Sequence, residues 1–126
     1  MIALDASVLI AVLRSADPHH DAALGVFERD DEFVAHTLTL AEVLTGAVRT
    51  GQDQELVDLF TRLGIQELGR LENEALRLAR LRAETPLKLP DCCVLLAAES
   101  QLAALATFDA RLAATAAGRG VSVIGG

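Results

Sequence analysis

The sequence contains no apolar run of the roughly 18 to 20 residues that a membrane-spanning helix needs, because charged and turn residues interrupt every candidate. Its N-terminus has no basic region and no small-residue cleavage site, so we expect no secretory signal peptide. Apolar residues still make up 52% of the 126 positions, too many for a disordered chain. We therefore expect one compact domain over residues 1–126, cytoplasmic and without a membrane contact.

Cysteine is rare, since the only two are the adjacent Cys92 and Cys93 within an apolar run. Neighbouring positions on a helix point in different directions, so we expect no disulfide between them. No His or Cys partners stand nearby at metal-ligand spacing, and His19, His20 and His36 do not form a recognisable ligand set. We predict two reduced thiols in the core.

Basic residues are outnumbered, with 11 Lys and Arg against 18 Asp and Glu and a net charge of −7. This balance argues against a protein that coats nucleic acid, which would carry a broad basic surface. It leaves open an enzyme that approaches nucleic acid through bound cations and a few arginines. Lys88 is the single lysine, and Arg is the better residue for bidentate contact with phosphate.

Short apolar segments alternate with helical patterns along the chain. We expect strands at residues 2–4, 32–36, 65–68, 103–107 and 121–124. We expect helices at residues 6–14, 19–29, 37–49, 52–63, 71–85, 92–101 and 109–117, with a loop at 87–90. The alternation predicts an α/β sandwich around a mainly parallel sheet.

Four acidic residues fall at junctions between these elements. Asp5 follows the first strand, Glu42 lies in the first turns of a helix, Asp91 starts a helix, and Asp109 follows a strand. In open parallel sheets, ligands bind beyond the carboxyl ends of the strands, where Asp5 and Asp109 should both lie. If Glu42 and Asp91 project there too, the anionic cluster needs a cation or shifted protonation.

Carboxylate oxygens without His or Cys suit Mg²⁺ or Mn²⁺. The chemistry that follows from such a site is phosphodiester hydrolysis. The metal lowers the pKa of a bound water, orients it for in-line attack, and offsets charge on the phosphate. Ser7 and Thr107 can position the water through their hydroxyls.

Each acid also has a purely structural interpretation. Thr39 and Glu42 match a capping box, in which Glu42 would only bond a backbone N–H. Asp91 and Asp109 can be ordinary N-caps or acids that compensate a helix dipole. Asp5 is harder to explain in this way, because a buried unpaired acid is costly. Together the four acids favour a functional site.

Four motifs in this order carry a family resemblance: LDASVLI at 4–10, TLAEVL at 39–44, LPD at 89–91 and ATFDARL at 106–112. In a chain of this length they resemble the PIN-domain ribonucleases, and more closely the VapC toxins of bacterial type II toxin–antitoxin pairs. The resemblance covers essentially the whole chain and implies a single PIN domain with a three-layer α/β/α fold.

The resemblance also implies an activity and partners. It implies Mg²⁺- or Mn²⁺-dependent endonucleolytic cleavage of structured RNA such as tRNA or rRNA, usually by a homodimer. It further implies a cognate VapB-type antitoxin, whose C-terminal segment wraps the toxin and often places an arginine or another group among the acids. By motif, the acidic metal-binding quartet is Asp5, Glu42, Asp91 and Asp109, and the polar positions beside it are Ser7 and Thr107.

The chain departs from the family pattern at two positions. Phe108 stands where many relatives have a polar residue, which can change how this loop meets RNA. Cys92 follows Asp91 where alanine is common. The RNA-binding surface is not marked by a basic run, and its candidate residues are Arg14, Arg49, Arg82, Lys88 and Arg111.

Three other kinds of protein compete with a toxin ribonuclease. A phosphoacceptor receiver-like domain would need a lysine after a late strand, whereas Lys88 precedes Pro90 in an expected loop. A dinucleotide-binding module would need a glycine-rich turn after the first strand, which is missing. A catalytically inactive PIN-like interaction module stays open, although the intact quartet argues against it.

Overall fold

The central sheet is built from parallel strands. The computed structural model describes residues 1–125, and its strands are β1 (Ile2–Leu4), β2 (Phe33–His36), β3 (Ile65–Leu68), β4 (Ala104–Ala106) and β5 (Val123–Ile124). Their order across the sheet is β3-β2-β1-β4-β5, and all pairings among these strands are parallel. The predicted α/β class is therefore confirmed, with a sheet that is parallel throughout the described residues.

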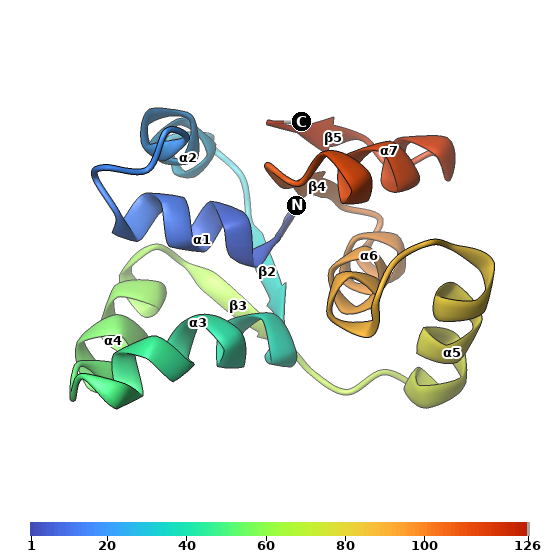
Figure 1. Cartoon of the computed structure of the whole chain (residues 1–126), viewed down its shortest axis with the longest axis horizontal. Coiled ribbons are helices and arrows are strands. Elements are labelled where there is room, and N and C mark those ends of the chain that lie inside the picture. Colours follow the sequence, from blue (N-terminus) through green and yellow to red (C-terminus); the bar gives the residue numbers. More distant parts are fainter. Residues whose placement is uncertain (126) are drawn as a thin grey trace.

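Helices connect these strands and cover both faces of the sheet (Figure 1). They are α1 (Ala6–Leu13), α2 (His20–Phe27), α3 (Thr37–Arg49), α4 (Asp53–Arg62), α5 (Glu74–Glu84), α6 (Leu89–Gln101) and α7 (Ala110–Gly118). Figure 1 shows α1 to α4 on one side of the strands and α5 to α7 on the other. This is the expected three-layer α/β/α arrangement.

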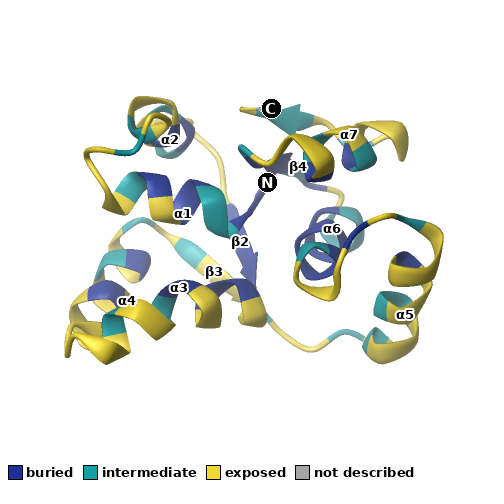
Figure 2. Cartoon of the chain, viewed as in Figure 1, coloured by how far each residue is buried: buried dark blue, intermediate teal, exposed yellow. Residues whose placement is uncertain are grey.

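Strand β1 shows why the sheet needs cover on both sides. Successive side chains of a strand point to opposite faces. Ile2 and Leu4 belong to the core beneath α1 to α4, while Ala3 belongs to the core beneath α5 to α7. All three are at most 1% exposed, and the buried strands run between exposed outer helix faces (Figure 2).

Helix α6 packs deepest of the seven described helices. Its positions 92–98 are all buried, and both cysteines are free thiols among them, as predicted. The helix begins at Leu89, so the expected loop at 87–90 was wrong for its last two residues. Proline fits the first turn of a helix because the N–H that it lacks would have no helical partner there.

The predicted helix at 71–85 is shorter than expected, and starts at Glu74. Asn73 adopts a left-handed conformation (φ 55°), which stops the helix from extending further back. The other predicted ends agree with the structure or differ from it by at most two residues.

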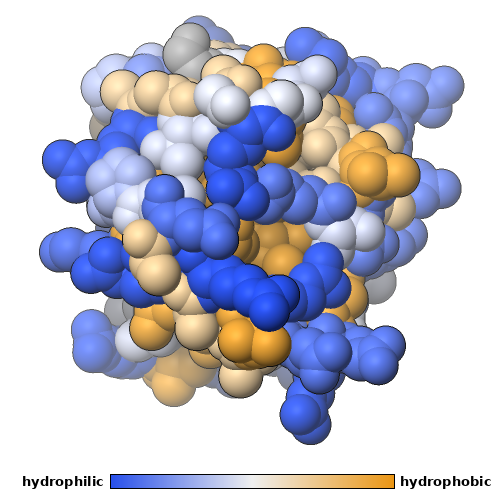
Figure 3. Space-filling model, turned by 90° about the vertical axis from the view of Figure 1, so that its right-hand side faces the viewer, coloured by the Kyte–Doolittle hydropathy of each residue, from blue (hydrophilic) through white to orange (hydrophobic). Residues whose placement is uncertain are grey.

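The outer surface on the side of α5, α6 and α7 is largely hydrophilic. Figure 3 shows hydrophilic side chains over much of it, with apolar surface in smaller areas between them. No helix within residues 1–125 is both long enough and apolar enough to cross a membrane.

Candidate active site

The candidate site lies at the carboxyl ends of β1 and β4. From the central β1 the chain builds one half of the sheet through β2 and β3, and then crosses to β4 and β5 on the other side. Leu4 pairs with Ala106, and the N–H of Asp5 donates to the carbonyl of Ala106 over 3.0 Å. Ligands bind in open parallel sheets at such a change of direction.

Asp5 is buried there, and its carboxylate accepts three hydrogen bonds. Oδ2 accepts from the hydroxyls of Ser7 and Thr107, each over 2.7 Å. Oδ1 accepts from the N–H of Ala6 over 2.9 Å, so Asp5 is also the N-cap of α1. Bonds to a charged acceptor offset part of the cost of burying the carboxylate, which is 7% exposed.

The two hydroxyls also hold the loop that follows β4. Ser7 Oγ accepts from the N–H of Phe108 over 3.1 Å, and Thr107 Oγ1 accepts from the N–H of Asp109 over 3.0 Å. Each hydroxyl thus donates to Asp5 and accepts from the β4–α7 loop. The network fixes the position of Asp109 relative to Asp5.

Asp109 is the N-cap of α7, because its Oδ1 accepts from the N–H of Leu112 over 2.9 Å. The N-cap interpretation is therefore confirmed for this residue. Its role as a cap does not remove it from the site, because the charge of Asp109 contributes to the raised pKa of Asp91.

Glu42 does not take part in a capping box. Helix α3 begins at Thr37, and its N-cap is His36, whose Nδ1 accepts from the N–H of Leu38 over 3.0 Å. Thr39 Oγ1 is buried without a hydrogen-bond partner, so it makes no capping bond. The capping-box alternative for Glu42 is wrong, and its carboxylate is left for another role.

The raised pKa of Glu42 indicates that its side chain lies near other acids of the site. Partial burial raises the pKa of this carboxyl, and the negative charges of Asp5 and Asp91 raise it further. Residues from α1, α3 and α6 therefore meet at one place, although Glu42 and Asp91 are far apart in sequence.

Asp91 lies in the first turn of α6, whose N-cap is Lys88. The N-cap alternative for Asp91 is therefore wrong, while its position still suits the helix dipole. Burial raises the pKa of Asp91, with further contributions from Asp5 and Asp109; the cations Lys88 and Arg111 act in the opposite direction. The structure thus brings the four sequence-selected acids into electrostatic contact.

The acids do not form one compact group of metal ligands. Within residues 1–125, no three His, Cys, Asp or Glu side chains converge closely enough to hold a single metal ion between them. Two oxygens of the cluster, those of Asp5, are already engaged by hydroxyl and backbone donors. Like charges that repel one another also favour separation of the remaining carboxylates.

Two histidines at or near this site were not assigned roles from sequence. His36 caps α3, and its Nε2 lies 3.5 Å from Glu74 Oε2. His19 stacks on Phe108, with ring centroids 4.4 Å apart and planes 7° from parallel. No local pattern signals the second contact, because it joins residues from opposite ends of the chain.

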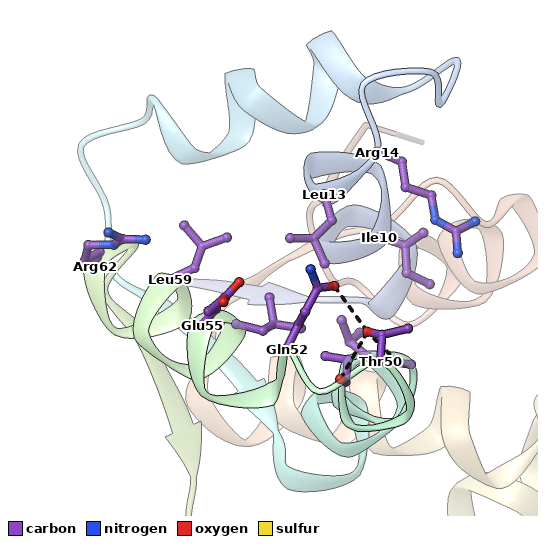
Figure 4. Close-up of a pocket in the computed structure, with 12 residues that line it drawn as sticks. Ile10, Leu13, Arg14, Thr50, Gln52, Glu55, Leu59 and Arg62 are labelled. Carbon is purple, nitrogen blue, oxygen red and sulfur yellow. Dashed lines mark hydrogen bonds between the residues drawn. The ribbon is translucent and has the colours of Figure 1, made fainter.

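A groove of about 470 Å³ with apolar and polar lining residues lies farther along the helices that follow β1 and β2 (Figure 4). Its walls come from α1, α3 and α4, and its labelled lining residues in Figure 4 are Ile10, Leu13, Arg14, Thr50, Gln52, Glu55, Leu59 and Arg62. Ile10 lies one helical turn beyond Ser7, and Gly46 in the groove lies one turn beyond Glu42. The groove therefore leads away from the acidic site along α1 and α3.

A family model for the PIN domain matches residues 2–118, so the chain belongs to the PIN-domain family. A toxin–antitoxin complex from Klebsiella pneumoniae contains a similar chain: identity is 25%, coverage is 90% of this chain and 89% of that one, and the TM-score is 0.74. No significant match was found among curated proteins.

Two further solved structures share the fold at lower identity. One is VapC20 of Mycobacterium tuberculosis, described as a toxin that cleaves the sarcin–ricin loop (14% identity, 91% of this chain and 95% of that one, TM-score 0.71). The other is VapBC2 of Rickettsia felis bound to a DNA fragment from their promoter (15% identity, 98% and 97%, TM-score 0.73).

Proposed function

We propose that this PIN-domain protein is a metal-dependent endoribonuclease and the toxin of a toxin–antitoxin pair. The observation that carries the proposal is the acidic site at the ends of β1 and β4. There, burial and neighbouring acids raise the pKa of Glu42 and of Asp91. The similarity to solved toxins and toxin–antitoxin complexes supports the biological role.

The donor chemistry of the site fits Mg²⁺ or Mn²⁺. Its side-chain donors are carboxylate and hydroxyl oxygens, which hard divalent cations prefer. Mg²⁺ commonly keeps several waters and binds through one or two carboxylates, so it needs no preformed trio of protein ligands. We propose that Asp5, Glu42, Asp91 and Asp109 hold the ion, directly or through water. When bound, such an ion lowers the pKa of a water molecule and offsets charge on the phosphate.

Ser7 and Thr107 act on Asp5 in this proposal. Both hydroxyls donate to Asp5 Oδ2, which supports a positioning role more than the direct water contact expected from the sequence. By holding one carboxylate oxygen in place, they fix the direction in which Asp5 faces the substrate. A preorganised ligand needs less rearrangement when charge develops during the reaction.

Two cations lie close enough to the acids to guide RNA phosphates. Lys88 and Arg111 both act on the carboxyl of Asp91, and both side chains are exposed. We propose that they contact the phosphates that flank the cleaved bond. Arg14, Arg49 and Arg82 stay candidates for more distant contacts, and Arg14 lines the groove.

The groove along α1, α3 and α4 suits an antitoxin segment. Its apolar side chains, among them Ile10 and Leu13, offer burial to an amphipathic peptide. The groove starts one helical turn beyond Ser7 and Glu42, so a basic side chain at the end of that peptide would be attracted to the acids. The toxin–antitoxin complexes among the similar structures support such a partner.

The family resemblance also supports a homodimer, which stays a prediction. Light scattering coupled to size-exclusion chromatography would measure it. A mass near 13.3 kDa at micromolar concentration would reject the dimer, and a mass near twice that value is expected.

A receiver-like phosphoacceptor is disfavoured by the topology. Flavodoxin-like receivers use the strand order 2-1-3-4-5, whereas the order here is 3-2-1-4-5. The single lysine, Lys88, stands at the N-cap position of α6 and does not follow a strand. An inactive interaction module is separated from a nuclease by the experiment below.

Expression of the chain in bacteria, followed by mapping of new RNA 5′ ends, tests the proposal. The wild-type protein should arrest growth and produce discrete RNA ends, and co-expression of the adjacent small reading frame should relieve both effects. The Asp91→Ala variant should neither arrest growth nor produce new RNA ends. Asp53→Ala, which removes an exposed acid from α4, is the matched control and should behave as wild type. Harmless expression without new RNA ends would leave an inactive module as the better description.

A further inference from the structure

The stacked pair of His19 and Phe108 lies at the edge of the acidic site. Phe108 stands between Thr107 and Asp109, and its N–H donates to Ser7 Oγ over 3.1 Å. Its ring stacks on the imidazole of His19, which directly precedes α2. Figure 1 shows the segment that leads into α7 extending toward the side of the molecule where α2 lies.

The phenyl ring is held firmly in place. It packs against the core beneath α1 to α4, and Gly125 approaches it so closely that a Cβ there would lie 2.9 Å from Cε1 of Phe108. Together with the backbone bond to Ser7, these contacts fix the ring. Phe108 is therefore a rigid support for the imidazole of His19 that stacks on it.

The backbone that carries the His19 imidazole is fixed by the segment before α2. The backbone N–H of His19 donates to Asp17 Oδ1 over 2.8 Å, and the ring of the neighbouring His20 bonds the carbonyl of Ala11 through Nδ1 over 2.7 Å. His19 itself is exposed. One ring face is covered by Phe108, and the exposed imidazole can receive a further planar group.

Aromatic rings are scarce in this chain, which makes the position notable. Of the four Phe residues, Phe33 and Phe60 are buried in the core, and Phe27 packs against it. Phe108 also packs against this core, and it alone of the four is next in sequence to an acid of the site. No core requirement explains a histidine stacked on it from the solvent side.

We propose that His19 and Phe108 form a stacking platform for an unpaired nucleobase of the RNA beside the cleaved phosphodiester. The inference rests on the proposed ribonuclease function. Nucleobases stack on aromatic faces with little dependence on sequence, and proteins read RNA chiefly where bases are unstacked in loops and ends. A chain with a net charge of −7 gains little from general attraction to phosphates, so a stacking contact has particular value here.

The platform is tested with single-stranded oligoribonucleotides of ten nucleotides that carry one 2-aminopurine, moved through the positions around the mapped cut. Binding is measured with Ca²⁺ in place of Mg²⁺ by the quenching of 2-aminopurine fluorescence. The wild-type protein should quench one position strongly. His19→Ala should lose this quenching and bind about 5- to 150-fold more weakly, the loss typical of one stacked base.

Two variants serve as matched controls. His19→Phe keeps a stacking ring and should retain both quenching and affinity. Leu24→Ala removes a partly exposed side chain from α2, 41% exposed, and should change neither. Because His19 is exposed, its replacement should leave the circular dichroism spectrum and the melting temperature unchanged.

An abasic nucleotide at the quenched position gives a second, independent readout. Removal of the base should weaken wild-type binding as much as His19→Ala does, and the variant should bind intact and abasic RNA equally well. Additive losses from the two changes, or wild-type affinity of His19→Ala, would overturn the platform.

The outcomes separate this inference from the ribonuclease proposal. If the wild-type protein cleaves RNA and His19→Ala binds it equally well, the platform is rejected and the nuclease stands. If quenching depends on His19 in oligoribonucleotides but no RNA is cleaved, the stacking of a base on His19 stands, while the nuclease and the placement of that base beside a cleaved bond are rejected. A His19→Ala variant that loses only antitoxin affinity would show that a protein group occupies the rings, and would also reject the platform. Absence of any RNA binding rejects both.

Discussion

Thr107 donates a hydrogen bond of 2.7 Å to Asp5 Oδ2, although 102 positions separate the two residues in the sequence. The bond joins the end of β4 to the end of β1, at the centre of the sheet. The same hydroxyl accepts from the N–H of Asp109. A single buried oxygen thus couples two acids of the candidate site.

Replacement of Thr107 by Val should destabilise the fold and reduce RNA cleavage. Valine has nearly the same shape but leaves Asp5 with one donor fewer and the N–H of Asp109 without its partner. Unpaired buried groups of this kind cost about 1–3 kcal/mol each. Urea denaturation measures the loss in the free energy of unfolding. Thr107→Ser retains the hydroxyl and should keep most of the activity; equal stability and activity of wild type and Thr107→Val would contradict the positioning role.

Without divalent cations, stability should fall as the pH rises through the acid range. The pKa values of Glu42 and Asp91 are raised from ordinary values of 4.5 and 3.8, so the folded protein holds protons that the unfolded chain has released. The stabilisation is present below the unfolded values, from about pH 4, and is lost as both groups ionise in the folded state. Mg²⁺ replaces those protons, so its stabilising effect should grow with pH.

Urea denaturation at several pH values from about 4 to 7, with and without Mg²⁺, measures this linkage. Glu42→Gln removes one raised group and should flatten both the pH dependence and the Mg²⁺ effect. Glu72→Gln, which alters an exposed acid before α5, is the control and should do neither. A Mg²⁺ effect that is the same at every pH would argue that the ion binds elsewhere.

Both cysteines should be unreactive in the native protein. Burial raises the pKa of Cys92, and burial with the charges of Glu74, Cys92 and Glu42 raises that of Cys93 to about 11. The thiolate is the reactive form, so little is present at neutral pH. A chromogenic disulfide reagent should label no thiol in buffer and two in concentrated urea. Rapid labelling of the folded protein would show that α6 opens easily.

The sequence was sufficient to predict most of the fold because each element carries its own periodic signal. The strands and helices were found in the right order, and the all-apolar central strands β1 and β4 required cover on both faces. The start of α6 was missed because proline at residue 90 was taken to mark a loop, although proline is also favoured in a first helical turn.

The candidate site was only partly predictable, for a different reason. The acids could be selected by their positions at strand and helix ends, where local rules apply. Whether Glu42 caps a helix depended on His36, an uncommon N-cap that no local pattern favours. The stacking of His19 on Phe108 depends on how α2 packs against the β4–α7 loop, which only the tertiary structure determines.

RNA cleavage by Asp5→Asn, compared with wild type at equal concentration and in Mn²⁺ or Mg²⁺, tests the central claim most directly. Asparagine retains an oxygen that can accept from Ala6 and cap α1, so the fold should persist by circular dichroism while the negative charge is lost. Asp53→Asn on α4 is the control and should cleave normally. We predict cleavage by wild type and only the protein-free background for folded Asp5→Asn; cleavage by Asp5→Asn at the wild-type rate would contradict the assignment of this site.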